Sequence, residues 1–397
     1  MRLASRVAKI KPSETLAITA KANALKAEGR DVIGFGAGEP DFDTPANIKQ
    51  AAIKAIEAGF TKYTPVGGTD ELKDAIINKL KRDNSLEYKR SQIVVSCGAK
   101  HSLYNLAQAL FEADDEVIIP APYWVSYPDI VVLAGGTPVI LNTLEKDGFK
   151  INPQQLKAAI TPNTRALIIN GPSNPTGAAY SSEELKAIAA VLLNEDILII
   201  TDDIYEKILY TKYPFANIAS VESKLKDRTI VVNGVSKAYA MTGWRIGYAA
   251  GPEEIIAAVN KIQSQNTSNP TSISQKASVE ALSGDQSIVT MMVGEFQKRR
   301  DVIVAALNDI PDVKCLLPEG AFYVFPNVSG VYGRSYKGKK IIGSTELIDY
   351  LLDEANVATV PGAAFGSDDH IRLSYATSLK NIEEGVKRIK NAIAKLD

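Results

Sequence analysis

Residues 165–201 read RALIINGPSNPTGAAYSSEELKAIAAVLLNEDILIIT, and this stretch indicates the fold. Its two apolar runs, RALIIN (165–170) and ILIIT (197–201), have the length and β-branched content of buried strands. Between them, SSEELKAIAAVLLNE (181–195) begins with a serine cap followed by acidic residues, as a helix N-terminus does. Strands that are apolar throughout and separated by a helix predict a parallel sheet covered on both faces.

The same alternation continues on both sides of this stretch. Further strands are predicted at 92–96, 116–120, 137–141, 229–233 and 246–250, and a helix is predicted at 101–113. Together these patterns predict an α/β fold with a large, doubly wound, mostly parallel sheet domain over residues 45–283.

The C-terminal third has a different pattern. Three helical stretches flank shorter strand candidates and predict a smaller α+β domain over residues 284–397; the helices are expected at 285–308, 344–355 and 380–395, and the strands near 313–317, 321–326, 356–360 and 370–375. The first long helical pattern, residues 13–28, precedes the large sheet. We therefore expect residues 1–44 to pack with the small domain.

Composition excludes several classes of function. With 45 Lys and Arg against 46 Asp and Glu, the net charge is −1, which gives no reason to expect a nucleic-acid or membrane-surface partner. The longest apolar stretch, 117–136, contains three prolines and Asp129, which argues against a membrane span. Two cysteines cannot form a disulfide framework, and the N-terminus has no apolar signal region. A cytoplasmic location is therefore expected.

Metal chemistry is not expected. His101 and His370 are the only histidines in the chain. No cluster of metal ligands can be assembled around them from the sequence.

Unusual residues gather where the predicted strands end. Ligands of open parallel sheets bind beyond the carboxyl ends of the strands. Five loops follow such ends: SCGAKHS (96–102), APYWVSYP (121–128), NGPSNPTG (170–177), DDIYE (202–206) and NGVSKAY (233–239). Each also has an ordinary structural interpretation, namely a tight turn, packed aromatic residues, a turn without function, or a helix-capping aspartate.

The functional interpretations of these loops fit one planar, phosphorylated ligand. A glycine at a helix start, as in 96–102, suits an anion. Asp202, at the end of a buried strand, needs a partner and could face a cationic ring nitrogen. The Asn174 amide could donate to a phenolate or carboxylate oxygen, and Trp124 could stack on a planar ring.

Lys237 would supply the reactive group. A lysine becomes a nucleophile when neighbouring cations or burial lower its pKa. Ser236 and Arg245 stand close to it in the sequence and could both bind phosphate. A Schiff-base lysine, a phosphate site, a ring-nitrogen partner, a phenolate donor and a stacking aromatic residue together match pyridoxal 5′-phosphate (PLP).

At this point the chain closely resembles the fold-type I, class I aminotransferases, which are PLP-dependent. The resemblance covers nearly the whole chain and is closest to the bacterial aspartate aminotransferase and prephenate aminotransferase subgroup. The motifs that carry it are KPSETLAITAKANAL (11–25), GAGEPDFDTP (36–45), KYTPVGG (62–68), NPTG (174–177), DDIYE (202–206), SKAYAMTGWRIGY (236–248) and HIRLSYATS (370–378). Their combination is highly specific, although no single motif is.

The resemblance implies roles around the cofactor ring. Lys237 would hold PLP covalently and later carry the transferred proton. Asp202 would pair with the pyridine nitrogen and keep it cationic. Tyr205 and Asn174 would hydrogen-bond the ring phenolate, and Trp124 would stack on the ring. Trp124 and Asn174 would also border the substrate.

The resemblance also implies a phosphate cup and a dimer. The cup would consist of the backbone of Gly98, Ala99 and Lys100 together with Ser236 and Arg245. Tyr63 would reach the phosphate of the neighbouring subunit, so the active unit would be a homodimer with shared active sites. Gly234 departs from other subgroups, some of which carry a serine there that would add a donor.

Substrate choice would depend on two cations. In the family Arg372 clamps the α-carboxylate, and Gly38 approaches it through its backbone, although Arg372 taken alone would be interpreted as a surface charge. Lys100 would pair with the distal carboxylate of a dicarboxylic substrate. From the residues alone, its ammonium could instead supplement the phosphate site or be solvated. Family members that transaminate prephenate carry a threonine like Thr15 together with a lysine like Lys100, but plain aspartate aminotransferases of the subgroup share both features.

The expected function is therefore that of an aspartate aminotransferase, which transfers the amino group of L-aspartate to 2-oxoglutarate in a ping-pong reaction. The first alternative is a bifunctional enzyme that also converts prephenate to arogenate. A PLP-dependent lyase on the same fold is a further alternative. A transcription regulator is disfavoured, because such a protein needs a DNA-binding domain for which the sequence shows no segment.

Overall fold

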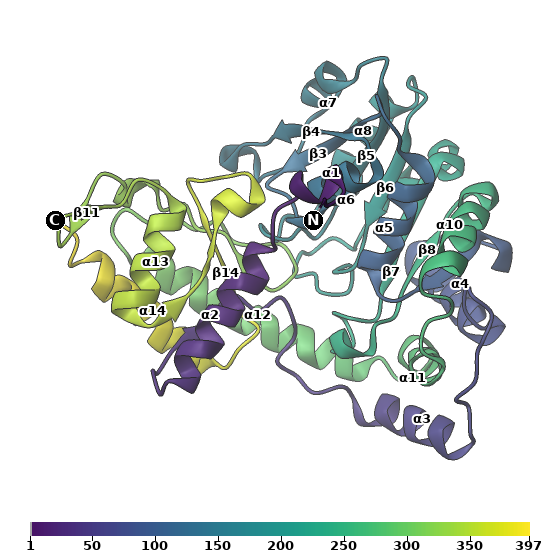
Figure 1. Ribbon diagram of the computed structural model, residues 1–397, viewed down its shortest axis with the longest axis horizontal. Helices are drawn as coiled ribbons and strands as arrows, with labels where there is room; N and C mark the ends of the chain where they lie inside the picture. Colours follow the sequence, from purple (N-terminus) through teal and green to yellow (C-terminus); the bar gives the residue numbers. More distant parts are fainter. Residues whose placement is uncertain (1) are drawn as a thin grey trace.

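A computed structural model describes residues 2–397, and a seven-stranded sheet dominates it (Figure 1). The strand order is β2-β8-β7-β6-β5-β3-β4. β8 runs antiparallel to both neighbours, whereas the other pairs are parallel. All seven predicted strands are confirmed: β2 (Ile93–Ser96), β3 (Glu116–Ala121), β4 (Thr137–Asn142), β5 (Thr164–Asn170), β6 (Leu198–Asp202), β7 (Thr229–Gly234) and β8 (Gly247–Ala250).

Helices cover both faces of this sheet, as its uniformly apolar strands require. In β3, Val117 and Ile119 join a core cluster with α5, α6 and α10, whereas Ile118 between them joins a cluster with α8 on the opposite face. The helices of this part are α3 (Ala46–Glu57), α4 (Asp70–Asn84), α5 (Ala99–Leu110), α6 (Ser126–Ala134), α7 (Pro153–Ala159), α8 (Ser182–Leu192), α9 (Ile218–Val221), α10 (Glu253–Asn266) and α11 (Ser272–Ser283).

The C-terminal part is built on a small antiparallel sheet of order β13-β14-β9. Its elements are α12 (Ser287–Asn308), β9 (Tyr323–Val324), β10 (Ser335–Tyr336), β11 (Lys339–Lys340), α13 (Ser344–Ala355), β12 (Val357–Ala358), β13 (Val360–Pro361), β14 (Ile371–Ser374) and α14 (Leu379–Ile393). The predicted strand near 313–317 is wrong, because only an isolated bridge joins Lys314 to Asn327. Its side chains pack on the core through Val313 and Cys315 without a ladder of hydrogen bonds.

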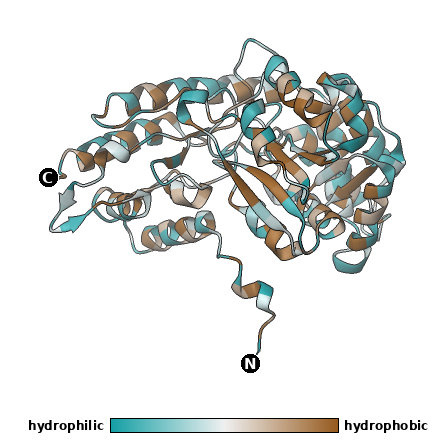
Figure 2. Cartoon of the chain, turned by 90° about the horizontal axis from the view of Figure 1, so that it is seen from above, coloured by the Kyte–Doolittle hydropathy of each residue, from teal (hydrophilic) through white to brown (hydrophobic). Residues whose placement is uncertain are grey.

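The N-terminal segment packs with the C-terminal part. It contains α1 (Ser5–Ala8), α2 (Glu14–Ala27) and β1 (Ile33–Gly34), and β1 pairs in parallel with β12. Ile18 of α2 and Phe35 belong to the same core cluster as α13 and α14. The segment before α2 instead leaves the C-terminal part (Figure 2); its helix α1 contacts α6, and Leu3 is 69% exposed.

The long helix α12 connects the two cores. Val289 and Met292 in its first half belong to the core that contains α3, α4 and α11. Phe296 and Ile303 in its second half belong to the core of the C-terminal part. A division of the chain into domains at residues 45 and 283 stays a prediction.

Short 3-10 helices complete the structure, at Arg90–Gln92, Glu145–Asp147, Ser223–Arg228, Thr242–Trp244, Ser329–Val331 and Gly362–Phe365. None of the helices within residues 2–397 is long and apolar enough to cross a membrane.

The predicted cap of α8 gives a test of the fold. The Ser181 hydroxyl accepts a hydrogen bond from the Glu184 N–H at 3.2 Å, and the Glu184 carboxylate accepts one from the Ser181 N–H at 2.7 Å. We expect Ser181→Ala to lower the free energy of unfolding by about 1 kcal/mol, because the Glu184 N–H loses its acceptor. Urea denaturation measures this, and Ser182→Ala, one residue further along, is the control. An equal loss in both variants would contradict the cap.

Candidate active site

One cleft of about 420 Å³ lies at the carboxyl ends of the central strands. Every site residue predicted from the sequence lines it except Gly98 and Tyr63. The predicted residues brought together are Thr15, Gly38, Ala99, Lys100, Trp124, Asn174, Asp202, Tyr205, Ser236, Lys237, Arg245 and Arg372. They come from the N-terminal segment, the large sheet and the small sheet, so the cleft forms only when all three parts are in place.

Lys237 follows β7 and turns its amine into the cleft. Its Nζ donates a hydrogen bond to the carbonyl of Gly38, and it lies 5.8 Å from the ring centre of Tyr205. Burial lowers the pKa of Lys237 to about 8, and the positive charges of Arg372 and Arg245 act in the same direction, whereas Glu39 opposes them. An accessible neutral amine is what a nucleophile or a general base requires.

Asp202 is the last residue of β6 and is only 4% exposed. Its Oδ2 accepts a hydrogen bond from the Tyr127 hydroxyl at 2.6 Å, and its Oδ1 accepts one from the Ile204 N–H at 3.3 Å. Burial raises the pKa of Asp202, and these hydrogen bonds and the charge of Lys237 oppose that rise. The side chain is therefore a buried carboxylate that a cation in the cleft would stabilise.

Arg372 in β14 is a buried cation with an incomplete set of partners. Its Nη1 donates to Asn174 Oδ1 at 3.0 Å and its Nη2 donates to the carbonyl of Gly36 at 2.7 Å, whereas its buried Nε has no acceptor within residues 2–397. Its guanidinium lies 4.6 Å from the ring centre of Tyr323. Burial lowers the pKa of Arg372. A carboxylate in the cleft would supply the missing negative charge.

The start of α5 and Arg245 form an anion cradle. Gly98, the N-cap residue, has φ +91°, and a Cβ on it would lie 2.2 Å from Arg245 Nη2. Arg245 donates to the carbonyls of Thr242 at 2.8 Å and Cys97 at 3.3 Å. Although Gly98 does not line the cleft, the absence of its side chain lets the guanidinium approach the helix N-terminus. Such an end with free N–H groups attracts phosphate.

The backbone around Gly234 leaves no room for a serine side chain. A Cβ at this position would lie 2.8 Å from the carbonyl oxygen of Ile246. A serine would therefore require β7 and β8 to move apart.

Lys100 and Trp124 border the cleft together. The Lys100 amine lies 4.8 Å from the ring centre of Trp124 and forms no ion pair among the residues that the structure describes. Partial burial of the amine, and then the charge of Arg245, lower the pKa of Lys100. Trp124 itself packs edge-on against Tyr127, with ring centres 5.2 Å apart, which fixes the orientation of its face.

Thr15 and Tyr63 differ in their position. Thr15 lies in α2 at the cleft, with its hydroxyl 3.0 Å from that of Ser13. Tyr63 is 92% exposed and lies outside the cleft. The single chain therefore gives Tyr63 no contact with the other site residues.

Sequence reasoning missed several side chains of this site. The Tyr127 hydroxyl donates a hydrogen bond to Asp202. The hydroxyl oxygens of Tyr323 and Tyr205 lie 2.8 Å apart. Glu39 accepts a hydrogen bond from Thr242 at 2.8 Å. Tyr127 stands in APYWVSYP and Glu39 in GAGEPDF, so both motifs contained a signal. Tyr323 follows no predicted motif, and only its place beside Arg372 in the small sheet reveals it.

Within residues 2–397, no group of three or more His, Cys, Asp or Glu side chains is arranged to hold a metal ion.

Comparison with known proteins agrees with this geometry. The family model described as aminotransferase class I and II matches residues 30–389. The chain belongs to the class I and II aminotransferases. It is a PLP-type transaminase by family, as the resemblance of its motifs predicted, and its α/β fold is that of the family.

Relatives and solved structures of this family match over the full length. An aspartate/prephenate aminotransferase of Nitrosomonas europaea is 55% identical, covering 99% of this chain and 100% of the relative. An aspartate aminotransferase of Bacillus subtilis is 52% identical, covering 100% of both. The crystal structure of an aspartate aminotransferase from Rhizobium meliloti superposes with a TM-score of 0.97 at 49% identity and full coverage of both chains. That of a Thermus thermophilus aspartate aminotransferase with maleate gives 0.93 at 41%, covering 99% of this chain and 100% of that one.

The lowered pKa of Lys237 predicts how its amine reacts with pH. Because the pKa is about 8, we expect acylation of Lys237 in the chain without cofactor to rise through about pH 8 and to level off above it. Glu39→Gln should move this midpoint to lower pH, since Glu39 favours the charged amine. Mass spectrometry of the modified peptide measures both, with Glu57→Gln at the exposed end of α3 as the control. A midpoint near that of a free lysine would contradict the prediction.

Proposed function

We propose that the protein is an aspartate aminotransferase that uses PLP to transfer the amino group of L-aspartate to 2-oxoglutarate. The observation that supports this best is Arg372, which is 2% exposed and shares the cleft with Lys237, and whose buried Nε finds no acceptor in the part of the chain that the structure describes. A buried guanidinium is costly unless an anion pairs with it. The α-carboxylate of an amino acid is an anion of the right shape for this fork.

The residues of the cleft fit PLP. The cradle of Gly98 and Arg245, which a Cβ on Gly98 would fill, suits the phosphate, with Ala99 and Ser236 beside it. Asp202 would hold the ring nitrogen, and Tyr205 and Asn174 the ring oxygen. Bound PLP supplies a conjugated ring that takes up the electron pair left when the substrate α-carbon loses its proton.

The protein's own groups would position the substrate and move the proton. Lys237, whose neutral amine is accessible near pH 8, would accept the α-carbon proton at Nζ and return it during the reaction. Arg372 would hold the α-carboxylate, and Asn174 keeps the guanidinium in place through its Oδ1 at 3.0 Å. Trp124 would cover one face of the bound molecules and exclude water.

Lys100 supports the preference for a dicarboxylic substrate. Its amine lies at the cleft, forms no ion pair with a carboxylate among residues 2–397, and packs on Trp124. Two cations facing one ligand favour a molecule with two carboxylates, such as aspartate, glutamate or their oxo acids. An apolar side chain would leave the ammonium unpaired, which is costly.

A second candidate is a bifunctional enzyme that also transaminates prephenate, a ring dicarboxylate. Thr15 lies at the cleft, and the 55% identical relative from Nitrosomonas europaea is named for both substrates. A PLP-dependent lyase has less support, because the full-length relatives are named as aminotransferases.

The assembly and the location stay predictions. The 92% exposure of Tyr63 fits a role at a neighbouring subunit, as a homodimer with shared active sites requires. The net charge of −1 fits a cytoplasmic protein without a nucleic-acid partner.

Substrate choice tests the proposal. With aspartate and 2-oxoglutarate, the enzyme loaded with PLP should form oxaloacetate and glutamate, and alanine should be a poor substrate. We expect Lys100→Gln to lower kcat/KM for aspartate by about tenfold to a hundredfold while changing that for alanine much less, because only the distal carboxylate loses its partner. Lys157→Gln on exposed α7 is the control.

Two outcomes would count against the proposal, and a third would extend it. Equal turnover of alanine and aspartate would remove the role of Lys100. Release of ammonia from the amino acid without an amino acceptor would indicate a lyase. Formation of arogenate from prephenate would establish the bifunctional enzyme.

The phosphate cradle gives an independent prediction. Gly98→Ala should weaken PLP binding by about tenfold or more, because its Cβ displaces the Arg245 guanidinium and its φ of +91° strains any other residue. Equilibrium titration with PLP, followed by absorbance, measures the dissociation constant. Gly294→Ala, where a Cβ meets nothing within 4 Å, is the matched control. Unchanged affinity in Gly98→Ala would place the phosphate elsewhere.

A further inference from the structure

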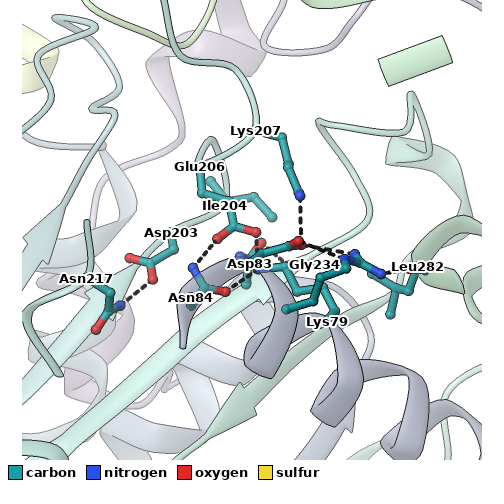
Figure 3. Close-up of polar contacts among 12 residues, drawn as sticks. Lys79, Asp83, Asn84, Asp203, Ile204, Glu206, Lys207, Asn217, Gly234 and Leu282 are labelled. Atoms are coloured by element: carbon teal, nitrogen blue, oxygen red, sulfur yellow. Dashed lines mark hydrogen bonds and ion pairs between the residues drawn. The ribbon is translucent and has the colours of Figure 1, made fainter. Parts of the chain in front are cut away.

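The turn that follows β6 has two sides with different partners. Asp202 and Tyr205 face the cleft. Glu206 and Lys207 instead point away from it, toward the end of α4 (Figure 3). The stretch 202–207 therefore supplies polar side chains to the cleft, and on its other side it is hydrogen-bonded to a helix more than a hundred residues earlier in the chain.

Behind the turn, Lys79, Asn84 and Glu206 form a closed ring, which we call the α4 ring (Figure 3). Lys79 Nζ contacts Glu206 Oε1 and donates to Asn84 Oδ1 at 2.7 Å, and Asn84 Nδ2 donates to Glu206 Oε2 at 2.8 Å. Both oxygens of Glu206 and both ends of the Asn84 amide are thus engaged. Such a ring fixes the side-chain torsions of all three members.

The α4 ring is almost completely shielded from water. Lys79 is 2% exposed, Asn84 7% and Glu206 8%. Removing an ion pair from water costs much of what its attraction returns, and apolar residues of the same volume often stabilise a fold equally well. Net stability therefore does not explain why charges occupy this position. What the ring adds over apolar packing is a fixed geometry.

The adjacent residue is fixed as well. Asp203, 2% exposed, accepts hydrogen bonds from Thr201 and from Asn217 Nδ2, the latter at 2.5 Å. Its own carbonyl accepts the Glu206 N–H at 2.9 Å. Burial raises the pKa of Asp203 to about 7, and the charge of Glu206 adds to this rise. Asp203 and Glu206 are thus two buried acids close together, and the positive charge of Lys79 compensates for them.

We propose that the α4 ring positions Asp202 and Tyr205, and that Lys79, Asn84 and Glu206 are positioning residues for the transaminase reaction. Glu206 is bonded in sequence to Tyr205, and its N–H closes the turn that begins at Asp203, next to Asp202. A shift of Glu206 is therefore transmitted to both cleft residues. The effect on the reaction rests on the proposed function, because the cofactor ring is what Asp202 and Tyr205 would contact.

The test uses a variant that removes the ring but not the packing. In the double variant Lys79→Met and Glu206→Met, two buried charges leave together and side chains of similar volume replace them, so folding should be retained, although the buried Asn84 amide loses both of its partners. Lys207→Met is the matched control. It removes the ion pair of Lys207 with Asp83, whose atoms lie 2.7 Å apart, from the same turn without touching the ring.

Four measurements separate positioning from stability. In the double variant, hydrogen exchange of the peptide 203–209 should rise in the chain without cofactor, while the thermal midpoint should fall by only a few degrees, because only the Asn84 amide loses its partners. With PLP bound, kcat for aspartate should fall by about tenfold to a hundredfold, since misplacement of about 1 Å has effects of this size. The pH midpoint of the cofactor absorbance should rise, because the phenolate loses a well-placed donor. The control should match the wild type in all four.

The proposal is overturned if the folded double variant keeps wild-type exchange, kcat and absorbance midpoint. If the double variant does not fold, Asn84→Leu takes its place, because it removes the bridging amide and keeps the ion pair; wild-type values there overturn the proposal equally. Failure of the proposed function has a different signature. It would appear as absence of aspartate turnover in the wild-type chain, whereas the exchange of peptide 203–209 would still report on the ring.

Discussion

The parallel pairing of β3, β5, β6 and β7 is the constraint on which the rest of the structure depends. Parallel strands end at the same edge, so the residues that follow them converge although they are far apart in the sequence. Asn174 follows β5, Asp202 ends β6 and Lys237 follows β7 in this way. The strands are buried on both faces, and the polar ends therefore open only toward the cleft.

Buried charge gives the cleft its chemistry. Burial lowers the pKa values of both Arg372 and Lys237, because it disfavours their positive charges. An anion that binds at Arg372 offsets this cost, and at Lys237 the loss of a proton removes it. Burial of a positive charge therefore produces a carboxylate-binding site at Arg372 and a reactive amine at Lys237. The α4 ring behind the same turn differs from the cleft, because its charges are already paired with each other inside the protein.

Most of the fold and much of the site follow from local patterns. The seven strands of the large sheet were predictable because each is an uninterrupted apolar run between turn or helix signals. The patterns near 321–326, 356–360 and 370–375 also predict strands where β9, β12, β13 and β14 lie, whereas 313–317 packs on the core without pairing. Tyr323 was nevertheless missed as a site residue, because only the pairing of β9 with β14 brings it to Arg372.

The sequence by itself determined the class of the large sheet, the loops that carry the polar residues and, through whole motifs, the aminotransferase family. It did so because strand burial, helix capping and motif composition are local properties. Only the tertiary structure decided that Arg372 Nε has no acceptor among the described residues 2–397, that Tyr127 donates a hydrogen bond to Asp202, and that Lys79 and Glu206 meet behind the turn. Those relations join residues from separate elements, and their energies depend on burial, which no local window of the sequence contains.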